Sequence, residues 1–354
     1  MKVALLTMDF PPTVGGVQTY LYEVSRRLGK YLDLAIVTPV DGLIPENTAF
    51  KRWVVPSSYP GNFLRILRTL KPYKVLIGHA HPRLLLPAAV AAFGRYLTIT
   101  YGNDYLAMQN HWHTPLSNRL LGASRPLITI SGHNAERLKN LGFPSVTTVP
   151  PGTDPTVFYP PPDHGSRPPV LLTAARLITR KGIDLVIQIL PTLIREFPNL
   201  VYLIAGEGPD RSRLESIARK NRVSGSIRFI GQIPYEKMPD IYRSADVFIM
   251  PSREEPQHTS IEGFGIVFLE ASASGLPIVA GKSGGTADAV RDGETGFLIP
   301  PDDRQTLLNT LQRLLKEPDL RRKMGLAGRR FVEEEMNWDR AAEQMRKCIE
   351  EPGA

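Results

Sequence analysis

Residues 159–174 read YPPPDHGSRPPVLLTA, and this stretch divides the chain into two parts. Residues 159–169 contain five prolines, and proline fixes φ and lacks a backbone N–H donor. Such a run forms neither a helix nor a central strand and is typical of a linker. The run that follows, Val170–Ala174, is apolar and begins a new strand pattern. The stretch therefore predicts a linker that leads into the first strand of a second domain.

On both sides of this linker, short apolar runs alternate with amphipathic stretches, which is typical of βαβ units on parallel sheets. The expected strands are Lys2–Thr7, Leu32–Pro39, Arg52–Val55, Lys74–Gly78, Leu97–Tyr101, Pro126–Ile130, Val146–Val149, Val170–Ala174, Val201–Ala205, Ile227–Ile230, Val247–Met250, Pro277–Ala280 and Gly296–Ile299. The expected helices include Val17–Gly29, Ile183–Phe197, Arg211–Val223, Phe264–Ser274, Pro318–Glu335 and Trp338–Glu350. We therefore predict an α/β fold with two Rossmann-like domains, residues 1–160 and 161–337, whose parallel sheets face each other across a ligand-binding cleft.

The length and composition agree with two soluble domains. The chain has 354 residues, and single hydrophobic cores stop growing at roughly 250–300 residues. Cys348 is the one cysteine, so no intrachain disulfide can form and a reducing compartment is favoured. The start lacks the long apolar run of a secretory signal, and the longest uncharged apolar stretch, Leu84–Gly94, reaches about half a membrane span. We therefore expect a cytoplasmic protein.

The net charge of +8 resides in the first half of the chain, because residues 1–160 hold 16 of the 43 basic and 8 of the 35 acidic residues. A basic half favours an anionic partner, such as lipid head groups, a lipid-phosphate acceptor or nucleic acid, although chance surface charge explains it equally well. Arg65, Arg68, Lys71 and Lys74 alternate with leucines and could form a basic amphipathic helix at the inner face of a membrane, or an ordinary surface helix. We expect no nucleic-acid partner, because the basic half lacks the aromatic–basic motifs of the known modules.

The loop after the first expected strand, residues 9–17 (DFPPTVGGV), is a candidate phosphate site. Gly15 and Gly16 allow close backbone approach, and the expected helix offers N–H groups and a positive dipole end. The alternative interpretation is a plain tight turn. The loop matches neither the fingerprint G-x-G-x-x-G nor a P-loop, and residues 206–211 (GEGPDR) lack the third glycine, which disfavours a nicotinamide dehydrogenase.

A second candidate lies in residues 174–184 (AARLITRKGID), where the first expected strand of the second half passes into a helix. Arg176 and Lys181 are two cations at this carboxyl end of a strand. Cations held there could neutralise the charge that develops on a departing diphosphate. A solvated charge cluster is the alternative.

Residues 262–270 (EGFGIVFLE) place two carboxylates around a glycine turn and the start of a helix. Glu270 has apolar neighbours, and a carboxylate in such surroundings costs free energy unless a partner bonds to it. The hydroxyls of a ribose or sugar are suitable partners, because a carboxylate accepts from both members of a vicinal diol. The alternative is that Glu270 is a buried cap or a member of an ion pair.

The stretch from Glu262 to Glu270 resembles the E-x7-E motif of the family 4 glycosyltransferases, which have the GT-B fold. Five further stretches resemble family motifs in the same order along nearly the whole chain. Four of them precede the acidic motif: the opening loop (residues 10–16), the N-G-x-D-x-x-x-F pattern at 151–158 with Pro151 in place of the usual Asn, the pair Arg176 and Lys181, and ADVFIMPS at 245–252. The fifth, the glycine loop at 283–285, follows it. Within the family, the chain is most similar to the phosphatidyl-myo-inositol mannosyltransferases.

This resemblance implies a role for each matching residue. Arg176, Lys181 and the backbone of Gly15 and Gly16 would hold the donor diphosphate. The remaining donor contacts would come from Glu262, Gly263, Phe264, Gly265 and Ile266 at the sugar, Glu270 at the ribose hydroxyls and Ile233 at the base. A terminal helix at about residues 338–354 would pack back on the first domain.

One position departs from the family pattern. The family has His-Gly at the end of a strand of the first domain, and the histidine lies over the donor sugar, whereas residues 100–104 here read TYGND. Tyr101 in that place can bond a sugar hydroxyl but carries no positive charge. His79 and His81 end the previous expected strand and could partly substitute. We expect them, with Asn103 and Asp104, as candidate acceptor or sugar contacts.

The resemblance implies a retaining glycosyltransferase, with Arg176, Lys181, Glu262 and Tyr101 as catalytic residues. It would move a hexose, mannose or glucose, from a nucleotide-diphosphate sugar such as GDP-mannose to a lipid-linked or glycan acceptor. We expect no cofactor and no metal, because protein cations take the metal's place and the sequence has no D-x-D triplet. The alternatives are a nucleotide-sugar epimerase or hydrolase on the same fold, and a non-catalytic nucleotide-sugar or membrane-binding protein, which Tyr101 alone supports.

Overall fold

The computed structural model describes residues 1–42, 48–55, 73–91, 96–109, 114–161, 167–254 and 261–351. The chain forms two compact units: unit 1 is Met1–Gly152 with Trp338–Ala354, and unit 2 is Thr153–Asn337. The division thus falls before the proline-rich run at which the sequence placed it. The reason is that the Thr153 N–H donates to the Met336 carbonyl at 3.0 Å and Phe158 is buried in unit 2.

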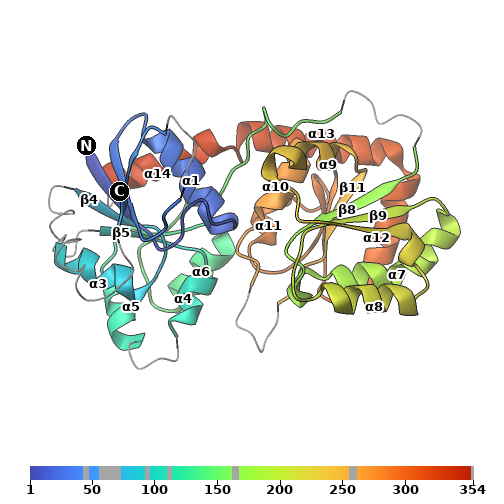
Figure 1. Cartoon of the computed structure of the whole chain (residues 1–354), viewed down its shortest axis with the longest axis horizontal. Helices are drawn as coiled ribbons and strands as arrows, with labels where there is room; N and C mark the ends of the chain where they lie inside the picture. Colours follow the sequence, from blue (N-terminus) through green and yellow to red (C-terminus); the bar gives the residue numbers. More distant parts are fainter. Residues whose placement is uncertain are drawn as a thin grey trace. The chain divides into compact units, whose positions relative to one another are not determined.

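Unit 1 is built on a seven-stranded sheet in the order β3-β2-β1-β4-β5-β6-β7, with every described pair parallel. Its strands are β1 (Lys2–Leu6), β2 (Asp33–Thr38), β3 (Lys51–Val54), β4 (Lys74–Ile77), β5 (Tyr96–Thr100), β6 (Leu127–Thr129) and β7 (Val146–Thr148). Its helices are α1 (Gly16–Leu28), α3 (Pro82–Ala91), α4 (Asn103–Ala107), α5 (Thr114–Gly122), α6 (Gly132–Asn140) and α14 (Trp338–Glu350). Figure 1 shows α1 and α14 on one face of this sheet and α3 to α6 on the other.

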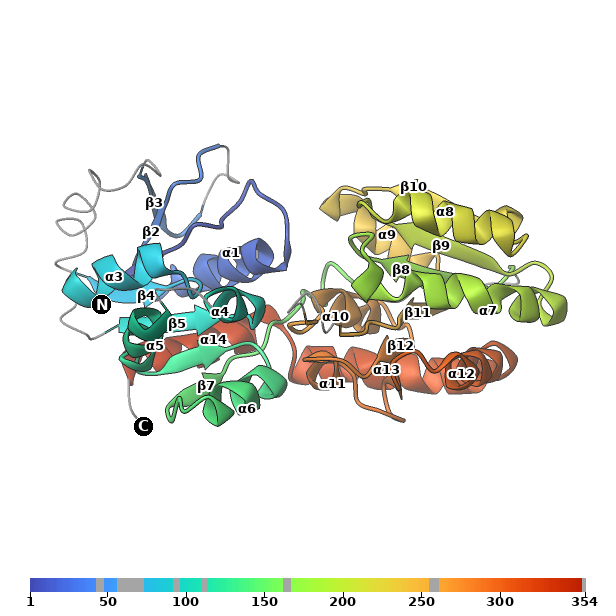
Figure 2. The ribbon, with the colours of Figure 1, turned by 90° about the horizontal axis from the view of Figure 1, so that it is seen from below.

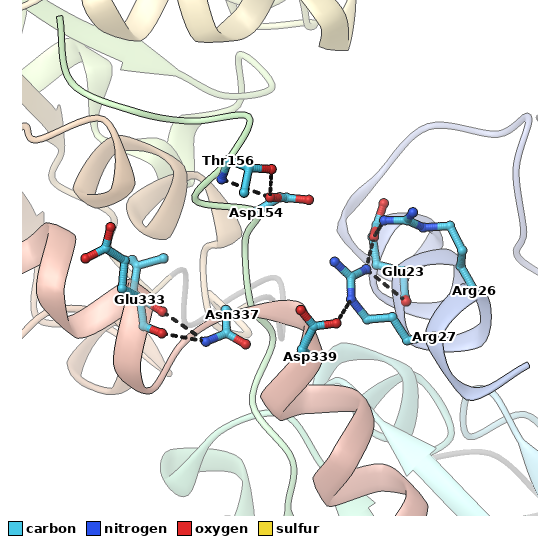
Figure 3. Close-up of polar contacts among 9 residues, drawn as sticks. Glu23, Arg26, Arg27, Asp154, Thr156, Glu333, Asn337 and Asp339 are labelled. Atoms are coloured by element: carbon cyan, nitrogen blue, oxygen red, sulfur yellow. Dashed lines mark hydrogen bonds and ion pairs between the residues drawn. The ribbon is translucent and has the colours of Figure 1, made fainter. Parts of the chain in front are cut away.

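The last helix belongs to unit 1 through contacts with α1. The Arg27 guanidinium in α1 donates to the Asp339 carboxylate in α14 at 2.7 Å and also pairs with Glu23 (Figure 3). The Trp338 ring is buried and packs edge-on against Tyr20, with 6.1 Å between the ring centroids. The terminal helix therefore covers the same face of the sheet as α1.

Unit 2 is built on a six-stranded parallel sheet in the order β10-β9-β8-β11-β12-β13. Its strands are β8 (Val170–Ala174), β9 (Val201–Ala205), β10 (Ile227–Gly231), β11 (Val247–Met250), β12 (Ile278–Gly281) and β13 (Gly296–Ile299). Its helices are α7 (Ile183–Glu196), α8 (Arg211–Lys220), α9 (Met238–Arg243), α10 (Ile266–Ala273), α11 (Thr286–Ala289), α12 (Arg304–Lys316) and α13 (Pro318–Glu334). Figures 1 and 2 place α7, α8 and α12 on one face and α9, α10 and α13 on the other.

These elements confirm the predicted strands and helices, because each expected run overlaps an observed element of the same type. Most strands are apolar and buried along most of their length, as expected for parallel sheets with helices on both faces. Among the described residues, none of the helices combines the length and the apolar character that a membrane span requires. The expected basic helix around Arg65, Arg68 and Lys71 lies outside the described residues.

Both sheets reverse their strand order beside their first strand, between β1 and β4 in unit 1 and between β8 and β11 in unit 2. Ligands of open α/β sheets bind at such a switch point, outside the carboxyl ends of the strands. The loops that follow these four strands therefore form the candidate site in each unit.

Candidate active site

Glu262 lies at the centre of a buried ion cluster in unit 2. Its Oε2 accepts from the Lys181 ammonium at 2.6 Å and from the Arg180 guanidinium Nη1 at 2.7 Å. Burial alone would raise the pKa of this carboxyl, but the two cations hold it below its usual value. Burial lowers the pKa of Lys181, and Glu262 partly restores it. Two cations share one carboxylate oxygen, so the cluster carries an excess of positive charge that favours an anionic ligand.

Two glycines hold the backbone of this cluster. Arg180 and Lys181 lie in a short 3-10 turn, Thr179–Lys181, that ends at Gly182 in the left-handed region with φ of 70°. A Cβ at Gly182 would lie 2.1 Å from the Pro251 carbonyl oxygen, and a Cβ at Gly284 would lie 2.2 Å from the Glu262 carbonyl oxygen. Glycine is therefore required at both positions, because the loops after β8, β11 and β12 approach one another at van der Waals distance.

Arg176 is placed differently from Lys181. Its side chain is exposed in the loop after β8 and makes no ion pair within the described part of the chain. The structure therefore brings Lys181 and Glu262, 81 positions apart in the sequence, into direct contact. It leaves the Arg176 guanidinium to solvent or to a ligand.

The second carboxylate of the acidic motif has different surroundings. Glu270 is buried in α10, and its Oε2 accepts a hydrogen bond from the Tyr242 hydroxyl at 2.6 Å. Burial raises the pKa of Glu270 to about 7, and the Tyr242 hydrogen bond opposes that rise. Between the two carboxylates, Phe264 is buried and Gly265 has φ of 91° where the loop turns into α10. Gly263 and Ile266 are half-buried there, as is Ile233 in the loop after β10.

In unit 1, the loop after β1 leads directly into α1. Gly15 stands at the N-cap position and Gly16 begins the helix. Among the described residues no side chain caps this helix start, and its first turn contains no acidic residue. The positive end of the α1 dipole is therefore not offset by a carboxylate of its own first turn, which suits an anionic ligand.

Asp104 ties together the loops after β4 and β5. Its Oδ1 accepts from the Thr100 hydroxyl at 2.7 Å and from the Tyr101 N–H at 2.9 Å, and its Oδ2 accepts from the Ala80 N–H at 2.9 Å. These bonds indicate that Asp104 shapes the loops that carry the other candidates. Asn103 begins α4 with its side chain exposed.

The Tyr101 hydroxyl is buried and has no hydrogen-bond partner within the described residues. Its ring packs edge-on against Tyr20 at 5.8 Å between centroids, and burial raises the pKa of the hydroxyl well above its usual value. It therefore remains a neutral group with an unused donor. A buried donor without a partner costs free energy, and a bound sugar hydroxyl would offset that cost.

Neither His79 nor His81 takes the place of Tyr101 in the structure, and each has other contacts. Burial lowers the pKa of His79, and its Nδ1 lies 3.3 Å from the Thr7 hydroxyl, so the ring is neutral at pH 7. The rings of His79 and His81 lie 6.0 Å apart, and the His81 Nδ1 accepts from the Arg83 N–H at the start of α3.

Sequence reasoning missed two side chains that contact the acidic motif. Arg180 stands next to Lys181, and a second cation beside the first was a usable signal. Tyr242 gave no signal, because an aromatic residue on a short amphipathic helix is indistinguishable from an ordinary core residue.

Comparisons with known proteins show the family of the chain. The family model for glycosyltransferase family 4 matches residues 14–157, and the model for glycosyl transferases group 1 matches residues 160–331. The chain is 31% identical to the GDP-mannose-dependent alpha-(1-6)-phosphatidylinositol monomannoside mannosyltransferase of Mycolicibacterium smegmatis, over 94% of each chain. It is 29% identical to a glycogen synthase of Mycobacterium tuberculosis, over 79% of this chain and 69% of that protein.

Solved structures show the same fold. Anabaena HepE in complex with UDP superposes on this chain with a TM-score of 0.83 at 18% identity. The match covers 99% of this chain and 100% of the HepE chain. Sucrose-phosphate synthase from Thermosynechococcus elongatus superposes with a TM-score of 0.79 at 22% identity, over 99% of this chain and 98% of its own. The chain therefore belongs to the family 4 glycosyltransferases and has the GT-B fold. It is a hexosyltransferase that uses a nucleotide sugar.

Proposed function

We propose that this enzyme transfers mannose from GDP-mannose to a lipid-linked acceptor, with retention of the anomeric configuration and without a metal ion. The relatives named as GDP-mannose-dependent phosphatidylinositol monomannoside mannosyltransferases support this donor and this acceptor class. Anabaena HepE, whose solved structures hold UDP and UDP-glucose, makes UDP-glucose the competing donor.

The observation that carries the proposal is the ion cluster of Arg180, Lys181 and Glu262 at the carboxyl edge of unit 2. In the proposed mechanism, Lys181 and Arg176 neutralise the charge that develops on the departing diphosphate, which is the task a metal performs in other enzymes. The acceptor oxygen bonds to the anomeric carbon on the face from which the diphosphate oxygen leaves, and the acceptor proton passes to that departing oxygen. The α1 start at Gly15 and Gly16 is the phosphate-binding element that the proposal assigns to unit 1.

The donor is tested by thermal unfolding with GDP, UDP, ADP, NAD⁺, GDP-mannose and UDP-glucose, followed by a transfer assay in EDTA. A ligand that binds only the folded protein adds about 2.7 kcal/mol of stability at 100 times its Kd. We expect stabilisation by GDP and GDP-mannose and a mannosylated lipid product that forms in EDTA. Stabilisation by UDP and UDP-glucose would mean that UDP-glucose is the donor. A product without a new glycosidic bond would favour the epimerase or hydrolase alternative.

We also propose that unit 1 works at an anionic membrane surface, because the basic excess of the chain lies in its first half. We assign this surface to α3 and α5, which pack side by side (Figure 2). Leu86, Val90 and Leu116 are exposed there, Arg83 and Arg119 are exposed beside them, and neither helix contains an acidic residue. Apolar side chains with flanking cations suit the interface of anionic lipid.

Flotation with vesicles of equal parts phosphatidylglycerol and phosphatidylcholine tests this surface. We expect the protein to float with these vesicles and the double variant L86E/L116E to lose most of that binding. Leu326→Glu is the matched control, because Leu326 is equally exposed but lies in unit 2. Equal flotation of the double variant and the control would contradict the assignment to α3 and α5.

A further inference from the structure

Tyr242 is the one side chain of the described residues that holds the Glu270 carboxylate. Its hydroxyl donates to Glu270 Oε2 at 2.6 Å, and both side chains are buried. No described cation pairs with Glu270, in contrast to Glu262 with its two cations. The orientation of the Glu270 carboxylate therefore depends on a neutral hydroxyl.

The Tyr242 ring cannot move freely. It packs edge-on against Phe158 with 5.6 Å between centroids and at a tilt against Phe248 with 5.9 Å between centroids. Tyr242 also lies near the end of α9, where its carbonyl accepts from the Ala245 N–H at 3.1 Å. A wedged aromatic ring fixes the direction in which the hydroxyl points, so the hydrogen bond fixes the carboxylate in turn.

The chemistry of the proposed ligand requires an ionised and oriented carboxylate. Two hydroxyls of a vicinal diol donate to a carboxylate that is deprotonated, because a protonated acid offers a donor in place of one acceptor. Burial already raises the pKa of Glu270 to about 7, so a further rise would leave most of this carboxyl protonated at neutral pH. The Tyr242 bond favours the ionised form and leaves the other lone pairs for a ligand.

We propose that Tyr242 is a positioning residue for nucleotide binding, whose hydroxyl holds the Glu270 carboxylate in the orientation that accepts the ribose hydroxyls of the donor. This inference rests on the proposed function, since it concerns the nucleotide-sugar site of the same reaction. It adds a residue outside the acidic motif that acts through Glu270.

Tyr242→Phe tests the proposal, because the change removes the hydroxyl and keeps the packed ring. We expect the donor KM and the Kd for GDP to rise on the order of tenfold, the loss typical of a hydrogen bond to a charged group. At saturating donor, kcat stays within about twofold of the unsubstituted enzyme, because a residue that acts on ground-state binding shifts KM alone. Donor binding is lost as pH falls through the pKa of Glu270, and in Y242F this midpoint moves to higher pH.

Tyr202→Phe is the matched control. Tyr202 is also fully buried in unit 2, and its hydroxyl lies 2.7 Å from the Thr173 hydroxyl, away from Glu270. Y202F should lose stability but keep the donor KM and the pH midpoint. An unchanged KM and pH midpoint in folded Y242F would overturn the proposal, and so would the same change in both variants.

A double-mutant cycle with Glu270→Gln, read by GDP affinity, separates positioning from packing. We expect Y242F to have little further effect on GDP affinity in the E270Q background, because the ionised carboxylate that the hydroxyl orients is then absent. A full, additive loss would show that Tyr242 acts independently of Glu270 and would overturn the proposal.

A ligand-free measurement distinguishes this inference from the proposed function. The folded pKa of Glu270 lies above its unfolded value of 4.5, so its contribution to stability falls as pH rises from 4.5 to the folded pKa. In Y242F the folded pKa of Glu270 is higher, so the loss of stability with rising pH continues to a higher pH. Urea unfolding at several pH values, with E270Q as the reference, measures this. If no nucleotide binds the unsubstituted protein, the proposed function fails and the ribose role fails with it. If the loss of stability in Y242F ends at the same pH as in the unsubstituted protein, the Tyr242–Glu270 hydrogen bond is refuted, whatever the ligand.

Discussion

Glu262 and Glu270 stand in one motif and are equally buried, each with 7% of its surface exposed, yet their surroundings have opposite effects. Two cations lower the pKa of Glu262, whereas burial beside a neutral tyrosine raises the pKa of Glu270 to about 7. Burial is therefore not what decides the charge of a carboxylate. The partner of each carboxylate decides its charge. Glu262 is held as an anion by two cations, whereas Glu270 titrates near neutral pH.

The largest effect expected from this comparison is that of Glu262→Gln on stability. The change leaves Arg180 and Lys181 in a buried site without their counter-charge, and such a loss costs about 3–5 kcal/mol. Urea unfolding at pH 7 measures it. Glu236→Gln, at an exposed position of the same unit, is the control and should change stability by less than about 0.5 kcal/mol. A loss below about 1 kcal/mol in E262Q would mean that the cluster is not a tightly coupled unit.

Lys181→Ala should reduce turnover by about 10²–10³, the effect of losing one group that stabilises charge in the transition state. The assay is initial-rate transfer at saturating donor. Lys282→Ala is the control, because Lys282 is exposed in the loop after β12 of the same unit and forms no described ion pair. Near-normal turnover in K181A would remove Lys181 from the mechanism and leave the cluster a structural element.

Glu270→Gln should abolish a pH dependence of stability that Glu262 does not share. Because its folded pKa exceeds 4.5, Glu270 destabilises the folded protein as pH rises from 4.5 to about 7, on the order of 3 kcal/mol in total. The contribution of Glu262 has the opposite sign, since it is present above pH 4.5 and is lost as pH falls through its lowered pKa. Urea unfolding at pH 5 and pH 8 should show E270Q gaining stability relative to the unsubstituted protein as pH increases. An equal difference at both values would contradict the raised pKa.

The smallest effect concerns Tyr101, the neutral group in unit 1 that the resemblance places at the position of the family's histidine. Tyr101→Phe removes a buried hydroxyl that has no described partner and costs free energy, so the folded protein should become more stable, by about 1 kcal/mol. If the hydroxyl bonds the donor sugar, turnover falls about tenfold, the loss of one neutral hydrogen bond. Tyr20→Phe is the informative comparison, since that hydroxyl already donates to the Val149 carbonyl at 3.0 Å and its loss should lower stability instead. Unchanged turnover in Y101F would remove Tyr101 from the donor site.

Much of the fold could be predicted because its cause is local. The apolar runs of β8 and β11 and the amphipathic pattern of α7 are written in consecutive residues, and the alternation of such runs predicts parallel sheets. The boundary between the units was harder to predict from the sequence. The proline run marks a linker, but the Thr153–Met336 hydrogen bond and the buried Phe158 place the residues before that run in unit 2.

The sequence by itself determined the strand and helix pattern, the positions of the candidate phosphate loops and both carboxylates of the acidic motif, because these depend on residue type and short spacing. Only the tertiary structure decided which partner each carboxylate has. Arg180 and Glu262 are 82 positions apart, and Tyr242 and Glu270 are 28 positions apart, so no local pattern links them. The charge of a buried group depends on the field of whatever the fold places beside it, and that field is a property of the packed structure alone.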